Sequence, residues 1–160
     1  MLDHIDVEIV RLLQENARVP QVEIARAVGL APSAVLERLR KLEAKGVITG
    51  YVALIDPRAL DQRLLAFIAV RTTDRPGEGR VARELAAVPE VLEVHHVAGD
   101  DCLMLKVRAR DPEHLSQILR DRLGVIAGVQ HTRTTIVLET IKESVRLSIP
   151  AAADSEEVAS

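Results

Sequence analysis

A glycine between two helical patterns is the feature of this sequence that most restricts its fold. Residues 22–46 read VEIARAVGLAPSAVLERLRKLEAKG, with apolar residues at helical spacing on both sides of Gly29. Gly29 is expected to end the first helix in the left-handed conformation, with Leu30 folding back onto it, and Pro32 suits the first turn of the next helix. The stretch therefore predicts two helices joined by a tight turn, the second ending at Gly46.

A further helix is predicted before this pair. Asp3 and Asp6 are spaced as a variant of the capping box, and a helical pattern then runs to about Asn16. Pro20 suits the first turn of the middle helix. The predicted inward positions of the first helix are Ile5, Ile9, Leu12 and Leu13. Those of the middle helix are Val22, Ile24, Ala25 and Val28. Three short helices with this glycine turn constitute a helix-turn-helix module.

The outer face of the third helix carries the candidate DNA contacts. With Val35, Leu39 and Leu42 inward, small side chains near its start can approach base edges, and its cations can reach phosphates. The predicted DNA-binding residues are Ser33, Ala34, Arg38, Arg40 and Lys41. Glu37 fits this prediction only if it pairs with Arg40 or Lys41, or accepts from a cytosine amine. The alternative is an ordinary solvated face, since residues 1–50 hold seven basic and seven acidic side chains.

Composition excludes several classes of function. Tyr51 and Phe67 are the only aromatic residues in 160, which disfavours single-stranded nucleic acid, and the net charge of -3 argues against indiscriminate binding to polyanions. The lone Cys102 forms no internal disulfide or CxxC pair. The sequence shows neither a signal peptide nor an apolar run long enough to span a membrane, so a cytoplasmic protein is predicted.

The remaining sequence changes from helical to mixed periodicity. Residues 47–55 are rich in β-formers and predict a short strand or wing, and Asp56-Pro57 begins a connector. Two strand-helix-strand units follow, with predicted strands at 65–72, near 91–97, at 103–109 and at about 130–140. This order predicts an α+β, ferredoxin-like βαββαβ sheet with the first and third strands in the middle. Helices cover one face of such a sheet, and a second copy of the chain is the expected partner of the other face.

Four stretches, taken together and in order, resemble the leucine-responsive and asparagine regulator (Lrp/AsnC) family of transcription regulators. They are LDHIDVEIVRLLQENAR, EIARAVGLAPSAVLERLRKLEAKGVITGYVALIDP, VPEVLEVHHVAGDDCLMLKVRARD and GVQHTRTTIVLETIKE, from Leu2 to about Lys142. The resemblance implies a winged helix-turn-helix at 1–50, a hinge strand and linker at 51–62 and a ferredoxin-like domain at 63–145, before a flexible tail at 146–160. It also implies homodimers that assemble into tetramers or octamers, and an amino-acid effector bound between dimers.

The resemblance assigns roles to individual residues. Ser33, Arg38, Arg40 and Lys41 match the recognition helix. The implied effector-binding residues are Gly99, Asp100, Asp101, Cys102, Leu103, Thr132 and Thr134. Three positions depart from the family pattern: Pro20 and Ala31 replace common helix caps, and Cys102 stands where a carboxylate often follows the glycine. The last departure bears directly on the identity of the effector.

Three functions compete at this stage. The first is a sequence-specific regulator of transcription that binds double-stranded DNA and is tuned by an amino acid. The second is an architectural oligomer that wraps DNA with little ligand control. The third is a ferredoxin-like small-molecule binder or enzyme whose helical module contacts proteins. Enzymatic activity, cofactors and metals are not predicted, because His95 and His96 point to opposite faces of a strand and His131 lies on another edge strand.

Overall fold

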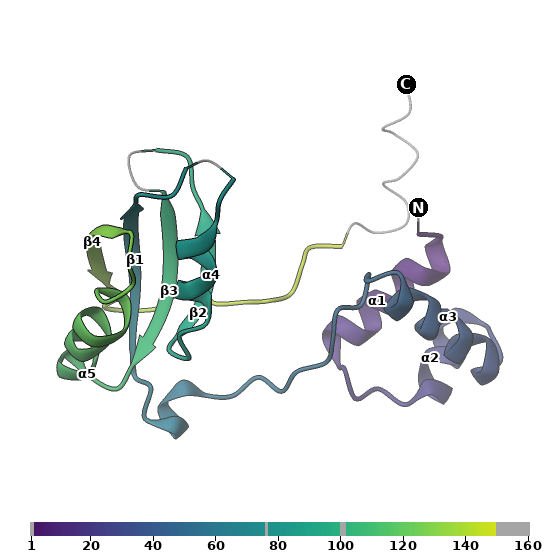
Figure 1. The fold of residues 1–160 in the computed structure, drawn as a ribbon. Helices are drawn as coiled ribbons and strands as arrows, with labels where there is room; N and C mark the ends of the chain where they lie inside the picture. Colours follow the sequence, from purple (N-terminus) through teal and green to yellow (C-terminus); the bar gives the residue numbers. More distant parts are fainter. Residues whose placement is uncertain (1, 76, 100–101, 150–160) are drawn as a thin grey trace. The chain divides into compact units, whose positions relative to one another are not determined.

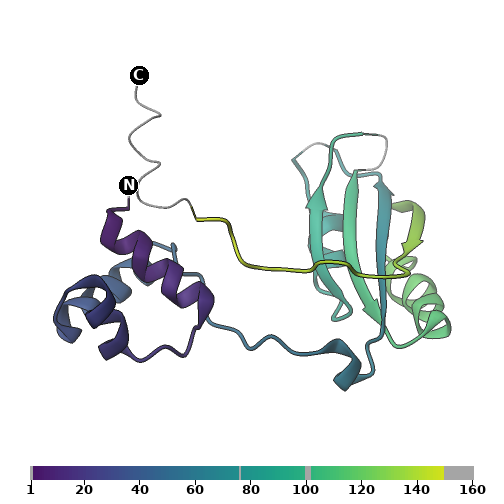
Figure 2. The ribbon, with the colours of Figure 1, turned by 180° about the vertical axis from the view of Figure 1, so that it is seen from behind.

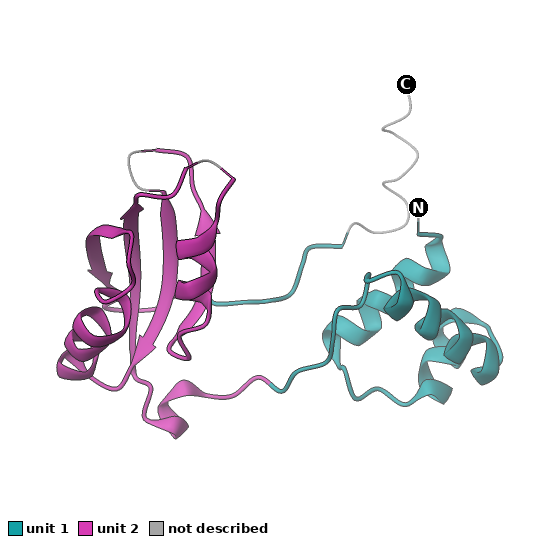
Figure 3. Cartoon of the chain, viewed as in Figure 1, with its two compact units in different colours: residues 1–53, 143–160 teal, residues 54–142 magenta. Residues whose placement is uncertain are grey.

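The computed structural model describes residues 2–75, 77–99 and 102–149. The chain separates into two compact units, one of residues 1–53 with 143–160 and one of residues 54–142 (Figure 3). The first unit is helical, and the second is a sheet with helices (Figure 1).

The helical unit has the predicted three helices, α1 (His4–Glu15), α2 (Gln21–Val28) and α3 (Pro32–Ala44). Asp3 is the N-cap of α1, and its carboxylate accepts from the Asp6 N–H at 2.8 Å. Gly29 ends α2 at φ 69°, and the Leu30 N–H returns to the Ala25 carbonyl at 3.0 Å. Gly46 is left-handed as well, at φ 68°. The predicted cap of the first helix and the two glycine turns are therefore confirmed. Glycine readily adopts the left-handed conformation, and the caps provide partners for N–H and C=O groups at the helix ends.

One predicted inward position of this unit is wrong. The helical core consists of Ile9, Ile24, Ala25, Val35, Leu39 and Leu42. Val22 is 57% exposed instead, while Val28 is partly buried against the core. Two residues along a helix correspond to a rotation of 200°, so Val22 and the buried Ile24 lie on nearly opposite sides.

Residues 47–56 contain no strand, contrary to the prediction. Val52 and Leu54 are 77% and 71% exposed. Tyr51 still binds back to α3, since its hydroxyl donates to the Glu43 carboxylate at 3.0 Å, and burial together with that carboxylate raises the tyrosine pKa. A strand requires a neighbouring strand for its hydrogen bonds, and none of the described residues supplies one here. The segment continues into a short 3₁₀ helix, η1 (Pro57–Leu60).

The second unit has the predicted ferredoxin-like topology. Its strands are β1 (Leu64–Thr72), β2 (Val91–His96), β3 (Leu103–Ala109) and β4 (Val129–Ile136), in the order β2-β3-β1-β4 with antiparallel neighbours. The first and third strands lie in the middle, as predicted. Helices α4 (Arg80–Ala86) and α5 (Pro112–Gln117), the latter continued by the π-helix η2 (Ile118–Leu123), pack on one face (Figures 1 and 2). β4 ends at Ile136, four residues before its predicted end.

The sheet buries its core on the helix-covered face. Val70 and Ile68 of β1 and Leu103 and Leu105 of β3 are all at most 1% exposed and pack in one cluster with Leu85 of α4. On the other face of β1, Leu65 and Ala69 are buried and Phe67 remains 38% exposed. Successive side chains of β1 point to opposite faces of the sheet, because a strand has a two-residue period.

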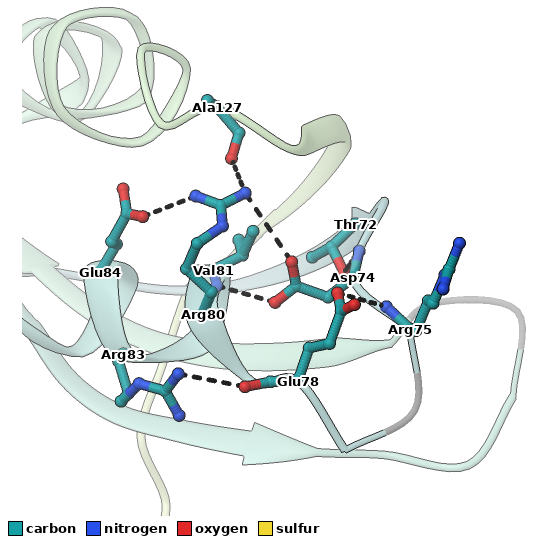
Figure 4. Close-up of polar contacts among 9 residues, drawn as sticks. All are labelled: Thr72, Asp74, Arg75, Glu78, Arg80, Val81, Arg83, Glu84 and Ala127. Carbon is teal, nitrogen blue, oxygen red and sulfur yellow. Dashed lines mark hydrogen bonds and ion pairs between the residues drawn. The ribbon is translucent and has the colours of Figure 1, made fainter.

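A polar cluster joins the start of α4 to the turn before β4 (Figure 4). The Asp74 carboxylate accepts from the Val81 N–H at 2.8 Å, so it caps α4 from outside the helix. Arg80 binds the Ala127 carbonyl at 2.7 Å and the Glu84 carboxylate at 2.6 Å. The second repeat is capped locally, since Asp111 accepts from the His114 N–H at 2.7 Å. Asp74 and Asp111, which precede the helices of the two strand-helix-strand units, therefore cap these helices in different ways.

The predicted tail at 146–160 is ordered at its beginning. The Gln14 side chain forms two hydrogen bonds with the backbone of Leu147, accepting from its N–H at 2.8 Å and donating to its carbonyl at 3.1 Å. Arg146 donates to the Glu15 carbonyl at 3.4 Å. Arg146 and Leu147 thus contact the end of α1. Residues 150–160, the rest of the predicted tail, lie outside the described residues.

Candidate functional site

The outer surface of α3 presents the side chains that were predicted to meet DNA. Ser33, Arg40 and Lys41 are exposed, and Ala34 is half-buried near the start of the helix. Ser33 and Ala34 belong to the first turn of α3 after Pro32, where the Ala34 N–H donates to the carbonyl of the N-cap residue Ala31 at 3.0 Å. Arg40 forms no ion pair with another residue in the described part of the chain. This surface therefore combines small residues at its N-terminal end with cations farther along.

Lys41 is paired with Glu37 one turn earlier. The lysine nitrogen and the Glu37 carboxylate are 2.6 Å apart on two exposed side chains, and the hydrogen bond from Lys41 lowers the carboxyl pKa of Glu37. The sequence interpretation required such a partner for Glu37. An exposed pair of this kind contributes little to stability, so a phosphate can replace the carboxylate at small cost.

Arg38 differs from the other predicted contacts. Its Nη1 donates to Asp3 Oδ2 and to Asp6 Oδ1, each at 2.7 Å. The side chain is 28% exposed, and that of Asp6 is 18% exposed. The hydrogen bond from the Asp6 N–H and then that from Arg38 lower the carboxyl pKa of Asp3, and bonds to Asp3 and Asp6 raise the pKa of Arg38. Sequence reasoning treated Asp3 and Asp6 as a local capping pair and missed their bonds to a helix more than thirty residues away.

The described effector candidates lie on β3, on β4 and in the β2–β3 loop. The Cys102 N–H donates to the Val70 carbonyl at 3.1 Å, which anchors the end of the β2–β3 loop on β1. Leu103 is paired with Val70, and Val70 is paired with Thr132. Leu103, Val70 and Thr132 therefore form one row across three strands. Thr134, two residues farther along β4, is paired with Ile68.

The row places the two threonines on the helix-covered face. Directly paired residues point to the same side of a sheet, and Val70 and Ile68 point into the core. Thr132 and Thr134 are half-buried there, on the edge strand β4. Leu103 is buried and is paired with both Val70 and His96, so its side chain is not exposed to a ligand at the surface. Gly99 has φ 134° with open space around it, and Asp100 and Asp101 lie outside the described residues.

The histidines do not converge. His95 is paired with Met104 and His96 with Leu103, so the two side chains lie on opposite faces of the sheet, as predicted. His131 is on β4, beyond both central strands. No group of three or more His, Cys, Asp or Glu side chains that could hold a metal ion occurs within the described ranges.

Comparison with known proteins decides what these two units are. Residues 2–49 match the winged helix-turn-helix DNA-binding family, and residues 65–147 match the Lrp/AsnC ligand binding domain. The HTH-type transcriptional regulator FL11 of Pyrococcus horikoshii is 43% identical over 149 residues, covering 92% of this chain and 97% of the relative. The leucine-responsive regulatory protein of Escherichia coli K12 is 40% identical over 151 residues, 92% of each chain. The chain belongs to the Lrp/AsnC family.

Solved structures agree with this assignment. The Neisseria meningitidis regulator NMB0573, solved as a complex with L-methionine, is 33% identical, covers 92% of this chain and 97% of its own, and has a TM-score of 0.84. The Mycobacterium tuberculosis feast or famine regulatory protein Rv3291c, also complexed with L-methionine, is 35% identical, with 94% and 100% coverage and a TM-score of 0.85. This Lrp/AsnC protein is thus a DNA-binding transcription regulator, and an architectural role is not favoured.

The Lrp/AsnC assignment also bears on the other predictions. Members named in the comparisons are regulators of transcription rather than enzymes. No helix in the described part of this chain has the length and apolar character needed to cross a membrane.

The helical unit of this Lrp/AsnC protein should lose stability in acid through Asp3. Its folded-state carboxyl pKa lies below the ordinary 3.8, so the stabilisation is present above the unfolded-state pKa and is lost as the pH falls through the folded value. We expect the free energy of unfolding to decrease below about pH 4, with a shallower decrease in Asp3→Asn, which keeps the N-cap but loses the charge. Urea unfolding followed by circular dichroism at several pH values measures this. The same decrease in the free energy of unfolding at low pH in the wild type and in Asp3→Asn would contradict the prediction.

Proposed function

We propose that this Lrp/AsnC protein reads paired DNA half-sites with α3 and that a methionine-like amino acid, bound at the end of the sheet, modulates the binding. The proposal is supported by the match of the helical unit to a DNA-binding family and of the sheet unit to the Lrp/AsnC ligand binding domain, together with two solved relatives that hold L-methionine. The surface of α3 and the row from Leu103 to Thr132 supply this chain's candidate residues.

The proposed DNA contacts are Ser33 and Ala34 with base edges and Arg40 and Lys41 with phosphates. Ser33 and Ala34 are small enough to let α3 enter the major groove closely. Arg40 is exposed, and Lys41 exchanges Glu37 for phosphate. With only these two proposed phosphate contacts, one copy of α3 binds DNA weakly. Two or more copies held together bind far more tightly, because the second contact becomes intramolecular.

The proposed effector site combines backbone and hydroxyl groups. Gly99 allows close approach to the backbone of the β2–β3 loop, where N–H groups suit a ligand carboxylate, and Asp100 or Asp101 is proposed to hold its ammonium group. Thr132 and Thr134 add hydroxyls on β4. Cys102 replaces the carboxylate common at this position with a small apolar side chain, which favours an apolar amino acid over a charged one.

We propose that the helix-free sheet face holds two copies together. Phe67, paired with Lys106 and Thr135, is the large apolar side chain exposed there. Wild-type protein is expected to sediment as a dimer or a larger assembly and Phe67→Glu as a monomer, because a buried carboxylate without a partner is costly. Val125→Glu, at an exposed position in the turn before β4, is the control. A Phe67→Glu protein that sediments like the wild type would contradict this interface.

Binding of L-methionine tests the effector site. At about 100 times its dissociation constant the ligand should stabilise the protein by about 2.7 kcal/mol, which corresponds to a rise in melting temperature of about 5–10 °C. Thr132→Val/Thr134→Val should lose most of that rise. Thr135→Val, on the opposite face of the same strand, should keep it. A parallel titration of DNA with and without L-methionine shows whether binding changes DNA affinity.

Two results would contradict the effector proposal. If none of the twenty amino acids raises the melting temperature of the wild type, the chain has no amino-acid effector of this kind. If L-methionine stabilises the double variant as much as the wild type, the ligand binds elsewhere.

A further inference from the structure

We propose that Arg38 is a positioning residue for DNA recognition. It holds α3 against the first turn of α1 and thereby sets the angle at which α3 meets the DNA, instead of binding a phosphate. The inference rests on the proposed role of α3 as the helix that reads DNA. It replaces the phosphate contact that the sequence predicted for this arginine.

The bonds of Arg38 connect two helices, whereas the ion pairs of Arg11 and Lys41 each stay within one helix. Arg11 pairs with Glu8 and Glu15 on its own helix, and Lys41 pairs with Glu37 on its own helix. Arg38 instead reaches 35 and 32 residues back, with both carboxylate distances at 2.7 Å. Charge-assisted bonds of this length belong to the strong class, and partial burial reduces their screening by salt.

Asp3 links this contact to the cap of α1. Its Oδ1 accepts from the Asp6 N–H, and its Oδ2 accepts from Arg38. Asp6 completes the cluster with Oδ1 on the same arginine nitrogen. A rotation or shift of α3 would therefore pull on the N-cap of α1 as well. The cluster fixes α3 at a point near the middle of its length, above the buried Leu39 and Val35.

Charge argues against a phosphate contact at Arg38. One guanidinium and two carboxylates sum to a net charge of -1, so a phosphate placed beside this cluster is repelled overall. Arg40, exposed on the same helix, forms no ion pair with a carboxylate among the described residues. The cluster lies beside the proposed DNA contacts, along an open depression lined by Asp3, Asp6, Ala34, Glu37, Arg38, Lys41, Leu42 and Lys45.

Salt-dependent DNA binding separates positioning from phosphate contact. The probe is a duplex selected from a random pool by the wild-type chain, and the full-length variants are Arg38→Gln, Asp6→Ala, their combination, and Arg40→Gln. Arg38→Gln and Asp6→Ala should each weaken binding about tenfold, similar to the loss of one base contact, with an unchanged slope of log K against log salt. The combination should bind no more weakly than Arg38→Gln alone, because loss of the arginine already removes its contact with Asp6. Arg40→Gln should reduce the slope by about 0.9.

Glu15→Ala is the matched control for removal of a carboxylate from α1, since it pairs with Arg11 and not with Arg38. It should leave the affinity within about twofold of the wild type, the scale of an ordinary surface substitution. Urea unfolding of each variant confirms that the binding assay measures folded protein. If Arg38→Gln does not fold, Asp6→Asn replaces it in the comparison.

Opposite results overturn the proposal. A phosphate contact predicts that Arg38→Gln lowers the salt slope by about 0.9 and that Asp6→Ala tightens binding by releasing the arginine. A purely structural role predicts lower stability with unchanged DNA affinity for both variants. If α3 does not read DNA at all, the result is different again, because Arg40→Gln would then leave both the DNA affinity and the salt slope unchanged.

Discussion

Alanine at position 128 is expected to lower the free energy of unfolding of the ferredoxin-like unit by about 2–4 kcal/mol. Gly128 has φ 102°, a backbone conformation that side chains rarely adopt. An added Cβ would lie 2.8 Å from Val81 Cγ2 and 2.9 Å from both Arg80 Nη2 and Thr73 Oγ1. Strain and crowding therefore act together at the turn that leads into β4.

The surroundings of Gly128 leave little room for relief. Arg80 is held by the Ala127 carbonyl and the Glu84 carboxylate (Figure 4). The Thr73 N–H donates to the Gly128 carbonyl at 2.9 Å. Moving either neighbour breaks the attachment of α4 or β1 to this turn. Because β4 carries Thr132 and Thr134, we also expect the response to L-methionine to decrease in this variant.

Two other glycines serve as controls. Gly29→Ala has a positive φ but open space around the new Cβ, so it should cost about 1 kcal/mol. Gly50→Ala has neither constraint and should change the free energy of unfolding by less than about 0.5 kcal/mol. Urea denaturation of the three variants gives the comparison. A cost for Gly128→Ala no greater than that for Gly29→Ala would show that the crowding is relieved in solution.

Arg40→Ala combined with Lys41→Ala is expected to weaken DNA binding about a hundredfold. Two lost contacts at about 1.4 kcal/mol each account for this factor. The slope of log K against log salt should decrease by about 1.8 for each chain bound, since two phosphates are no longer neutralised. Removal of Lys41 also leaves the Glu37 carboxylate unpaired beside the DNA backbone. Fluorescence anisotropy of a labelled duplex at several salt concentrations measures both quantities.

Arg120→Ala is the control for loss of an exposed cation outside α3. Arg120 is exposed in the ferredoxin-like unit and pairs with the neighbouring Asp121. Its loss changes the net charge of the protein without touching α3, so the affinity should change by less than about threefold. Unchanged affinity in the double variant would remove α3 from the DNA interface.

Local patterns predicted most of both units. The Asp3 cap, the Gly29 turn and the stripe of Val35, Leu39 and Leu42 are each set by residues within one or two turns of helix. The sheet order followed from two strand-helix-strand units and right-handed crossovers. The predicted strand at 47–55 failed for a physical reason: strand residues without a partner strand remain extended and exposed.

The candidate sites were predictable only in part. Residue types and spacing selected the candidate DNA contacts, because helical geometry alone places Ser33, Arg40 and Lys41 on the outer face. The same geometry places Ala34 and Arg38 on its flank. The effector residues came from family resemblance, since residues 99–103 and 132–134 are separated by about thirty positions. The register through Val70 shows how Leu103 and Thr132 come to lie in one row.

The sequence by itself determined the helix ends, the glycine turns, the βαββαβ order and the family. Each of these depends on short-range backbone preferences or on a pattern of residues along the chain. Only the tertiary structure decided that Arg38 binds Asp3 and Asp6, that Gly128 is enclosed by Val81, Arg80 and Thr73, and that Gln14 binds the backbone of Leu147. These contacts join residues that are 32 to 133 positions apart, where no local preference acts and only the packing of finished elements brings the partners together.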